Sequence, residues 1–519
     1  MVIRLALLGV ALAAGLSAGS ATAAAPDRHV VVLVWDGMRP DFISAETTPN
    51  LSQLAGNGVF FANHHPVYLS ATDGNATALA TGAYPSHSGL IANTDFRPAI
   101  DPAEPVVTGD PSTIRKGDEV SGDHFLALPT LAEILHTHGL ATAIAGSKWV
   151  ALLHDRGRRP DGPESSSVLF QGVMLPPSRT AALGVLGDFP AVAPDENKIA
   201  QDAWTTSALL TVLWQNGVPP YTLFWLAEPD ASQHAAGPGS AQALAAIKSS
   251  DTNLGCVLAE LDRRGLRATT DILIVSDHGF STIGRKVDVA AALAATGFDA
   301  RRKMPGGLPP GGVMVVANGG STLLYVGGHD PAVIRRLVEF LQQQDWTGVI
   351  FSRESYEGTF PLAAARIDSP EAPDLVVSLR WTADQSATGT PGLQVSDLNP
   401  ASVKVGNHAS LSRYDMHNTL VAAGPDFRPG VTDPLPSGNT DLAPTILWLL
   451  GCQAEATRMD GRVLAEALSV KGPPLKTFEL HRLTAQRDTG AGVWQQYLQV
   501  SEVNGVRYLD EGNGALAPK

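Results

Sequence analysis

The sequence predicts an α/β protein with a mostly parallel central sheet and helices on both of its faces. Continuous apolar runs at residues 30–35, 220–227 and 272–275 have the composition of buried parallel strands. Segments with helical spacing of apolar residues lie between them, the longest over residues 240–264. Acids or histidines follow all three runs. Open α/β sheets build their sites at the carboxyl ends of strands, so these runs also indicate where a site would lie.

The other elements follow in chain order from the same signals. Helices are predicted over residues 48–55, 129–138, 201–215, 287–295, 331–344 and 441–451, and further strands over residues 141–145, 321–326, 348–352 and 373–379. Residues 94–126 are polar and irregular, which predicts a surface excursion at the rim of the site. Asn504-Gly505 between two strand-like runs predicts a β-hairpin.

The first 25 residues have the pattern of an export signal. Arg4 is a minimal positive segment, residues 5–16 are apolar, and small residues around Ala23 offer a cleavage site. The apolar run is too short for a membrane span, and no later stretch is long enough. We therefore expect an exported chain, periplasmic or extracellular, without a stable membrane span after signal removal.

The mature chain is predicted to consist of a main domain and an extension. The main domain covers residues 26–470, with an α+β subdomain inserted at about 283–400. The extension covers residues 471–519 and contains the hairpin. A chain of 519 residues, 44% hydrophobic and 17% charged, is long enough for a large core. No feature of the sequence indicates an oligomeric state.

Charge and cysteine usage exclude some function classes. The net charge of -14, without clustered Lys and Arg, argues against a nucleic-acid binder. Cys256 and Cys452 both lie in apolar, helix-like surroundings, which predicts two buried free thiols. Neither begins a Cys-x-Pro-x-Arg pattern, so a modified catalytic cysteine is not supported.

Acids and histidines at successive strand ends form the candidate metal-ligand set. Asp36 follows the first apolar run, Asp230 and His234 follow the second, and Asp277 and His278 follow the third. His408 comes later in the chain. Carboxylates beside neutral imidazoles are good ligands for divalent metals. Helix capping explains any one of these acids, but it is a poor explanation for three strand ends together.

A hydroxyl and an amide precede a small-residue helix and are candidate catalytic groups. Thr72 lies at a loop-to-helix junction, where a helix N-terminus and a nearby metal can activate a hydroxyl. Ser70 is the alternative nucleophile, and capping is the alternative role for Thr72 and Asn75. Lys148 follows a short strand and could reach a substrate phosphate, although an ordinary solvated lysine is the favoured interpretation.

The motifs together resemble the alkaline phosphatase superfamily, specifically its nucleotide pyrophosphatase/phosphodiesterase group. The resemblance covers about residues 30–451, and its ordered set is more specific than any single piece. It implies an alkaline-phosphatase-like catalytic domain. The matching pieces are Asp36-Gly37, Thr72-x-x-Asn75, Thr81-Gly82-x-Tyr84-Pro85, Gly89-Leu90-Ile91-Ala92-Asn93, Glu228-Pro229-Asp230-x-x-x-His234, Ser276-Asp277-His278-Gly279, Gly406-x-His408 and Asp441-Leu442-Ala443-Pro444-Thr445.

The resemblance implies two divalent metal ions, with zinc the expected metal and manganese or iron the alternatives. One ion would be held by Asp230, His234 and His408, and the other by Asp36, Asp277, His278 and Thr72. Thr72 would attack phosphorus and form a phospho-threonine intermediate. An asparagine amide would donate to a nonbridging oxygen. Asn93 is the first candidate for that donor and Asn75 the second.

Some positions depart from the family pattern, and these departures bear on the expected substrate. Asp73-Gly74 replace the usual Phe-Pro after the nucleophile, and Ala409 replaces a glycine. A nucleotide preference is therefore not implied. We expect an exported two-metal phosphodiesterase or pyrophosphatase acting on a small phosphate ester. A phosphomonoesterase of the same fold is the first alternative. Its extra phosphate contacts would come from Lys148 or the basic run Arg156-Gly157-Arg158-Arg159, although a solvated surface is the favoured role for these residues. A non-catalytic binding protein is the second.

Overall fold

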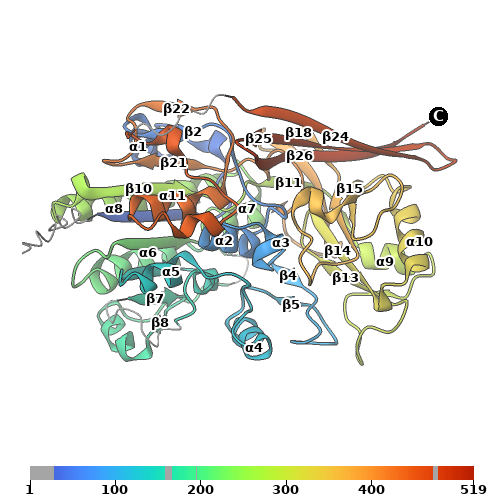
Figure 1. Cartoon of the computed structure of the whole chain (residues 1–519), viewed down its shortest axis with the longest axis horizontal. Helices are drawn as coiled ribbons and strands as arrows, with labels where there is room; N and C mark the ends of the chain where they lie inside the picture. Colours follow the sequence, from blue (N-terminus) through green and yellow to red (C-terminus); the bar gives the residue numbers. More distant parts are fainter. Residues whose placement is uncertain (1–27, 158–165, 194–195, 471–476, 519) are drawn as a thin grey trace, which may run out of the picture.

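The computed structural model describes residues 28–157, 166–193, 196–470 and 477–518. Its centre is a nine-stranded sheet in the order β22-β2-β21-β10-β1-β9-β6-β7-β8 (Figure 1). The strands on either side of the middle three are β22 (Val431–Asp433), β2 (Val59–Phe61), β21 (Leu420–Ala423), β6 (Thr142–Gly146), β7 (Ser167–Phe170) and β8 (Val173–Leu175). The sheet is mostly parallel, because β10, β1, β9, β6 and β7 run in one direction and the antiparallel pairings lie outside this block. The predicted fold class is confirmed.

Three adjacent strands form the middle of the sheet. They are β10 (Thr270–Val275), β1 (His29–Trp35) and β9 (Tyr221–Leu226). All residues of these strands are buried, which fits their continuous apolar composition. Val32 of β1 pairs with Leu273 on one side and Leu223 on the other, so the three strands are aligned in register.

Helices cover both faces of this sheet. One core cluster joins Val30, Val32 and Val34 of β1 to helices α2 (Thr72–Thr81), α5 (Leu131–Thr137) and α11 (Leu442–Leu449). The other joins the alternate residues, Val31 and Leu33, to α1 (Pro49–Gly56), α6 (Ile199–Ala208) and α8 (Ala241–Arg263). The alternation follows from the two-residue period of a strand.

The region after β10 carries the smaller sheets. A six-stranded sheet runs in the order β12-β13-β14-β17-β15-β16. Its strands are β12 (Ala300–Arg301), β13 (Val313–Ala317), β14 (Ser321–Val326), β17 (Leu375–Leu379), β15 (Thr347–Ser352) and β16 (Phe360–Pro361). Helices α9 (Val289–Ala294) and α10 (Pro331–Leu341) accompany it (Figure 1). A four-stranded sheet consists, in order, of β18 (Trp381–Gln385), β19 (Pro391–Asp397), β11 (Ser281–Val287) and β20 (Gly406–Asn407), and it leads back to the central unit.

The C-terminal extension forms a three-stranded antiparallel sheet that lies along the smaller sheets (Figure 1). Its hairpin of β25 (Val493–Val503) and β26 (Val506–Ala517) turns at Asn504 and Gly505, both with positive φ. The predicted hairpin is therefore present. Strand β24 (Glu479–Asp488), which pairs with β25, was not predicted because its side chains are mostly exposed and polar.

Three predictions need correction or qualification. The segment 94–126 is not wholly irregular, because residues Pro111–Ser121 form helix α4, capped by the side chain of Asp110. Cys256 is exposed rather than buried, since it lies on the outer side of α8, whereas Cys452 is buried. The predicted export signal lies outside the described residues. Within the described residues, no helix is long and apolar enough to cross a membrane.

Candidate two-metal site

Three neighbouring strands deliver the candidate site. Asp36 follows β1, Asp277 and His278 follow β10, and Asp230 begins helix α7 (Asp230–Ala236) after β9. Because these strands are parallel and adjacent, their carboxyl ends lie together. Gly37 permits the close approach of the segments, since its φ is +71° and an added Cβ would lie 3.3 Å from the Asp230 backbone.

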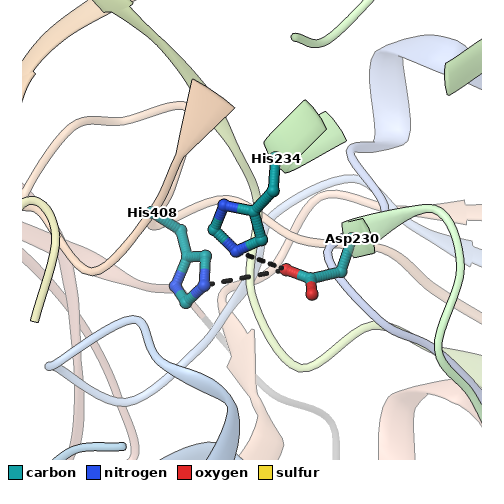
Figure 2. Close-up of side chains that lie close together, drawn as sticks. All are labelled: Asp230, His234 and His408. Carbon is teal, nitrogen blue, oxygen red and sulfur yellow. Dashed lines mark ion pairs between the residues drawn. The ribbon is translucent and has the colours of Figure 1, made fainter. Parts of the chain in front are cut away.

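The first donor group consists of Asp230, His234 and His408 (Figure 2). Asp230 and His234 lie four residues apart on α7 and therefore on one face of that helix. Oδ1 of Asp230 lies 3.3 Å from Nε2 of His234 and 3.7 Å from Nε2 of His408. His408 follows the short strand β20 (Gly406–Asn407). A carboxylate and two imidazoles converging on one point form a ligand set suited to a divalent metal.

The second donor group surrounds Nε2 of His278. This nitrogen lies 3.2 Å from Oδ2 of Asp277 and 3.6 Å from Oδ1 of Asp36. It also lies 3.3 Å from Oγ1 of Thr72. The two groups adjoin each other, because donor atoms of Asp36, Asp230 and His278 all lie within 4.8 Å of one another. The structure thus brings together all seven residues that the sequence suggested as metal ligands.

Each of the three carboxylates leaves one oxygen unpaired toward the histidines. Oδ1 of Asp36, Oδ1 of Asp230 and Oδ2 of Asp277 are buried and have no hydrogen-bond partner among the described residues. Their outer oxygens are paired: the indole of Trp225 donates to Oδ2 of Asp36 (2.9 Å), and the Gly37 N–H donates to Oδ1 of Asp277 (3.0 Å). Unpaired buried carboxylate oxygens are unfavourable unless a cation binds them.

In each of the three histidines, Nδ1 is held by a backbone carbonyl and Nε2 faces the site. Nδ1 of His234, His278 and His408 faces a backbone carbonyl oxygen, that of Gly406, Gly279 and Ser70 respectively, at 3.0, 2.8 and 2.9 Å. A carbonyl accepts only, so Nδ1 carries the proton and Nε2 presents a lone pair. Burial lowers the pKa of His234 and of His408, which keeps these imidazoles neutral and able to ligate. The donor set therefore fits two divalent cations.

Thr72 begins helix α2, and its neighbours have distinct environments. Oδ1 of Asn93 accepts the Asp73 N–H at 2.8 Å, which leaves the amide nitrogen to point away from Asp73, and this nitrogen bonds to no described residue. Asn75, by contrast, is fully buried, and its amide nitrogen donates to the carbonyls of Val67, Leu69 and Ala71. Its oxygen accepts from the Val67 N–H at 2.7 Å. Asn93 has a free donor, whereas Asn75 uses its polar atoms to shape the loop before Thr72.

Lys148 lies in the site and is not the solvated lysine that was favoured from the sequence. Its Nζ lies 2.7 Å from Oδ2 of Asp36 and 3.2 Å from Oδ2 of Asp230, and its side chain is only 24% exposed. Burial opposes the charge, but the two carboxylates outweigh it and raise the Lys148 pKa. The short strand β6 (Thr142–Gly146) places the residue there, next to β9 in the sheet.

The carboxylates of the cluster differ in their affinity for protons. Burial and the adjacent charge of Asp277 raise the pKa of Asp36 well above its ordinary value. For Asp230, burial again raises the pKa, but Lys148 and His234 outweigh burial and hold that pKa well below its usual range. The negative charges around Asp36 and Asp277 therefore repel each other, and bound cations would offset this repulsion.

Several residues that support the site were missing from the sequence analysis. Nδ2 of Asn439 donates to the backbone oxygen of Asp277 (2.8 Å) and to Oδ1 of Asn75 (2.9 Å). Nε2 of His64 in turn lies 3.0 Å from Oδ1 of Asn439. No local sequence signal marks these residues, because their partners lie hundreds of positions away.

Comparison with known proteins shows the family of this chain. Residues 30–403 match the family described as type I phosphodiesterase / nucleotide pyrophosphatase. The bis(5'-adenosyl)-triphosphatase enpp4 of Mus musculus is 21% identical over 448 residues, covering 85% of this chain and 81% of that relative. Ectonucleotide pyrophosphatase/phosphodiesterase family member 1 of Rattus norvegicus is 24% identical over 255 residues, covering 47% of this chain and 23% of that relative.

Solved structures show the same fold. Murine ectonucleotide pyrophosphatase / phosphodiesterase 5 superposes with a TM-score of 0.57 at 17% identity, covering 82% of this chain and 95% of that one. An inactive variant of the murine protein, in complex with AMP, superposes with a TM-score of 0.56. Since the family match covers most of the sequence, the chain belongs to the type I phosphodiesterase / nucleotide pyrophosphatase family of the alkaline phosphatase superfamily and is a metal-dependent hydrolase of phosphate esters.

Proposed function

We propose that this protein is an exported two-metal hydrolase that cleaves phosphodiester or nucleotide pyrophosphate bonds through a phospho-threonine intermediate on Thr72. The observation that carries the proposal is the set of three buried, unpaired carboxylate oxygens on Asp36, Asp230 and Asp277, each next to a bare imidazole Nε2. Asp230, His234 and His408 would hold one ion. Asp36, Asp277, His278 and Thr72 would hold the other.

Zinc is the metal we propose, because a mixed carboxylate and imidazole set is typical of zinc sites. When bound, two such ions would lower the pKa of the threonine hydroxyl and neutralise the charge that develops on the phosphoryl oxygens. The outer carboxylate oxygens remain held by Trp225, Gly37 and Lys148, so the inner oxygens are already oriented.

The residues of the chain carry out the displacement. Oγ1 of Thr72 loses its proton to solvent water and attacks phosphorus. The bond from phosphorus to the leaving oxygen breaks, and that oxygen takes a proton from water and leaves as an alcohol or a phosphate. Water then attacks the phospho-threonine, which releases the second product and restores the hydroxyl. The Asn93 amide nitrogen is the proposed donor to the nonbridging oxygen, because its amide is oriented by the Asp73 N–H.

The substrate we propose is a small phosphodiester or a nucleotide. The relatives' names indicate nucleotide pyrophosphate chemistry, and one solved neighbour is a complex with AMP. Asp73, however, follows the nucleophile directly, and its carboxylate is held by Oγ1 of Thr108 at 2.8 Å. This position offers no aromatic ring on which a base could stack. A nucleotide would therefore need a different contact for its base.

The decisive test combines metal analysis with two variants. Purified wild-type protein should contain about two divalent ions per chain and hydrolyse bis(p-nitrophenyl) phosphate. Thr72→Ala should lower kcat by at least about a thousandfold while metal content changes little, because one ligand of several is lost. Ser70→Ala is the matched control, since the Ser70 hydroxyl donates to the backbone oxygen of Ser410. Full activity of Thr72→Ala, or loss confined to Ser70→Ala, would overturn the role of Thr72.

A second candidate function, phosphomonoester hydrolysis, is favoured by one observation. Lys148 lies between Asp36 and Asp230 but contacts their outer oxygens, so it can stay beside bound ions. An added positive charge there favours a dianionic monoester over a monoanionic diester.

Lys148→Met separates the two candidates. If monoesters are the substrates, kcat/KM for p-nitrophenyl phosphate should fall at least about tenfold more than kcat/KM for its diester. Lys116→Met is the charge-matched control, because Lys116 pairs with Glu119 on the surface. An equal fall in kcat/KM for both esters would favour phosphodiester hydrolysis as the function.

A further inference from the structure

A second cavity lies where three parts of the chain meet. It has a volume of about 340 Å³. Its walls come from the segment before α2 together with residues 438–440, from residues 363–366 of the inserted region, and from the C-terminal sheet. None of the seven donor residues of the two-metal site lines it. Its volume is in the range of small-molecule pockets.

The cavity is basic although the protein is acidic. Its charged or titratable side chains, tyrosines apart, are those of Arg366, Arg507, His65 and His481, and it has no aspartate or glutamate in its lining. The whole chain carries a net charge of -14. Acidic groups behind the lining pair with some of its residues: Glu502 pairs with Arg507 at 2.6 Å, and Asp510 lies 3.5 Å from His65. Burial also lowers the pKa of His65 to about 4, so this imidazole is neutral at pH 7. The positive charge that remains available to an anion is that of Arg366.

Arg366 supplies the unused donors. Its guanidinium carbon lies 4.3 Å from the centroid of the Tyr84 ring, and the side chain forms no hydrogen bond or ion pair with any described residue. The residue is half-buried, and its backbone has φ 54°, in the left-handed region that arginine seldom adopts. A guanidinium stacked on a ring keeps the N–H groups at its edge free for an oxyanion.

The remaining walls suit an apolar body. Val67, Ala364, Val500 and Leu509 line the cavity beside the ring of Tyr68. The Tyr84 and Tyr508 hydroxyls are already engaged: Tyr84 donates to the backbone oxygen of Arg507 at 2.5 Å, and Tyr508 donates to Asp441 at 2.8 Å. The tyrosines therefore offer mainly the apolar surface of their rings to a ligand, and the arginine offers a positive charge.

We propose that this cavity is a second binding site, for a small molecule with an apolar, preferably aromatic, body and one oxyanion group. The oxyanion binds the free edge of the Arg366 guanidinium, and the body packs against the apolar wall. Asn439 lines the cavity and also donates to the backbone oxygen of Asp277. A ligand would thus lie one hydrogen bond away from the strand end that carries the metal-ligand residues.

The test uses 2-naphthalenesulfonate as the probe for the metal-loaded, full-length protein. Calorimetry should show saturable binding. The neutral 2-naphthalenesulfonamide and inorganic sulfate should each bind at least about tenfold more weakly, because each lacks one half of the ligand. Inorganic phosphate, which would occupy the two-metal site, should not displace the probe.

Two variants localise the binding. Arg366→Gln should weaken probe binding at least about tenfold, and Ala364→Trp should abolish it by filling the cavity. Arg336→Gln is the matched control, because its guanidinium lies 4.7 Å from the Phe298 ring on another surface. Retained diester hydrolysis shows that the variants are folded. Unchanged affinity in both cavity variants, equal binding of the sulfonamide, or displacement by phosphate would overturn the proposal.

Discussion

At the scale of single residues, the inner oxygens of Asp36, Asp230 and Asp277 explain why the site demands cations. Burying carboxylates without partners is unfavourable, and the raised pKa of Asp36 reflects both its burial and the charge of Asp277. Metal binding would relieve this repulsion, so metal removal should destabilise the fold. The residue that most affects Asp36 after burial itself is Asp277.

Asp277→Asn should therefore have opposite effects with and without metal. The variant should bind one divalent ion per chain instead of two. After chelation, it should be more stable than chelated wild type by about 1 kcal/mol, because one like charge is gone. Elemental analysis and thermal unfolding with and without chelator measure both effects. Asp299→Asn, which alters an exposed carboxylate, is the control. A chelated variant that is less stable than chelated wild type would contradict this account.

His64 predicts a pH dependence of stability. The residue is fully buried, and burial lowers its pKa from 6.5 to about 3. The unfolded chain therefore binds a proton that the folded chain does not bind between these pH values. Stability due to His64 is present above pH 6.5 and falls as the pH decreases toward 3. The contribution changes by about 1.4 kcal/mol per pH unit in that window.

The measurement is urea unfolding of wild type and His64→Gln at several pH values from neutral to mildly acidic. The variant should be less stable at neutral pH, because the bonds to Ser437 and Asn439 are altered. Its stability should depend less steeply on pH. His481→Gln, at a half-exposed position in the C-terminal sheet, is a control. Identical slopes for wild type and His64→Gln would refute the assignment.

At single positions, the sequence predicted which residues are candidate metal ligands better than it predicted the burial and the partners of side chains. Asp36, Asp230 and Asp277 were found because each follows an apolar strand, which is a local signal. Lys148 was misjudged, since its partner Asp36 follows β1, its partner Asp230 begins α7, and only the sheet order brings them together. Asn439 gave no signal at all for the same reason.

At the scale of elements, side chains of β25 attach the C-terminal sheet to the inserted region through burial and hydrogen bonds. Trp494 is fully buried and its indole donates to the backbone oxygen of Gly358 at 3.0 Å. The Gln496 side chain bonds both the N–H and the carbonyl of Ile350 in β15, at 2.8 and 3.1 Å. Such bonds resemble an additional strand pairing made by a side chain.

Trp494→Ala should consequently lower the free energy of unfolding by about 3–5 kcal/mol, as expected for truncating a buried tryptophan. Leu480→Ala is the matched control, because this β24 side chain is 60% exposed and should change stability by less than about 0.5 kcal/mol. Chemical denaturation of the three proteins compares the effects. Similar losses for the two variants would show that the sheet is not fastened through Trp494.

Elements with continuous or periodic apolar residues were predictable, and elements made mostly of polar, exposed residues were not. Strands β1, β9 and β10 lie within a residue or two of their predicted bounds, because they are buried on both faces. Helix α4 was missed within a polar segment, although Asp110 followed by Pro111 is a helix-start signal. Strand β24 was missed because mostly exposed polar side chains give no alternation.

At the scale of the whole molecule, the catalytic and structural roles occupy different parts of the chain. Every proposed metal ligand lies between Asp36 and His408, at one edge of the central sheet. The C-terminal sheet contributes Leu498 and Val500 to one core cluster of the inserted region and Trp494 to another. Tyr508 joins this sheet to the central unit, since its hydroxyl donates to Asp441, just before α11.

A chain that ends at residue 470 should therefore keep its metals but lose cooperativity. Removal of the C-terminal sheet exposes apolar surface in both clusters of the inserted region, so that region should unfold at a lower temperature than the central sheet. Calorimetry should show one transition for the full chain and two for the truncated chain, with about two divalent ions per chain in both. Tyr508→Phe, which removes the bond to Asp441 and the bond accepted from Arg462, should lower the midpoint and preserve the single transition. One transition at an unchanged temperature in the truncated chain would show that the extension does not join the two regions.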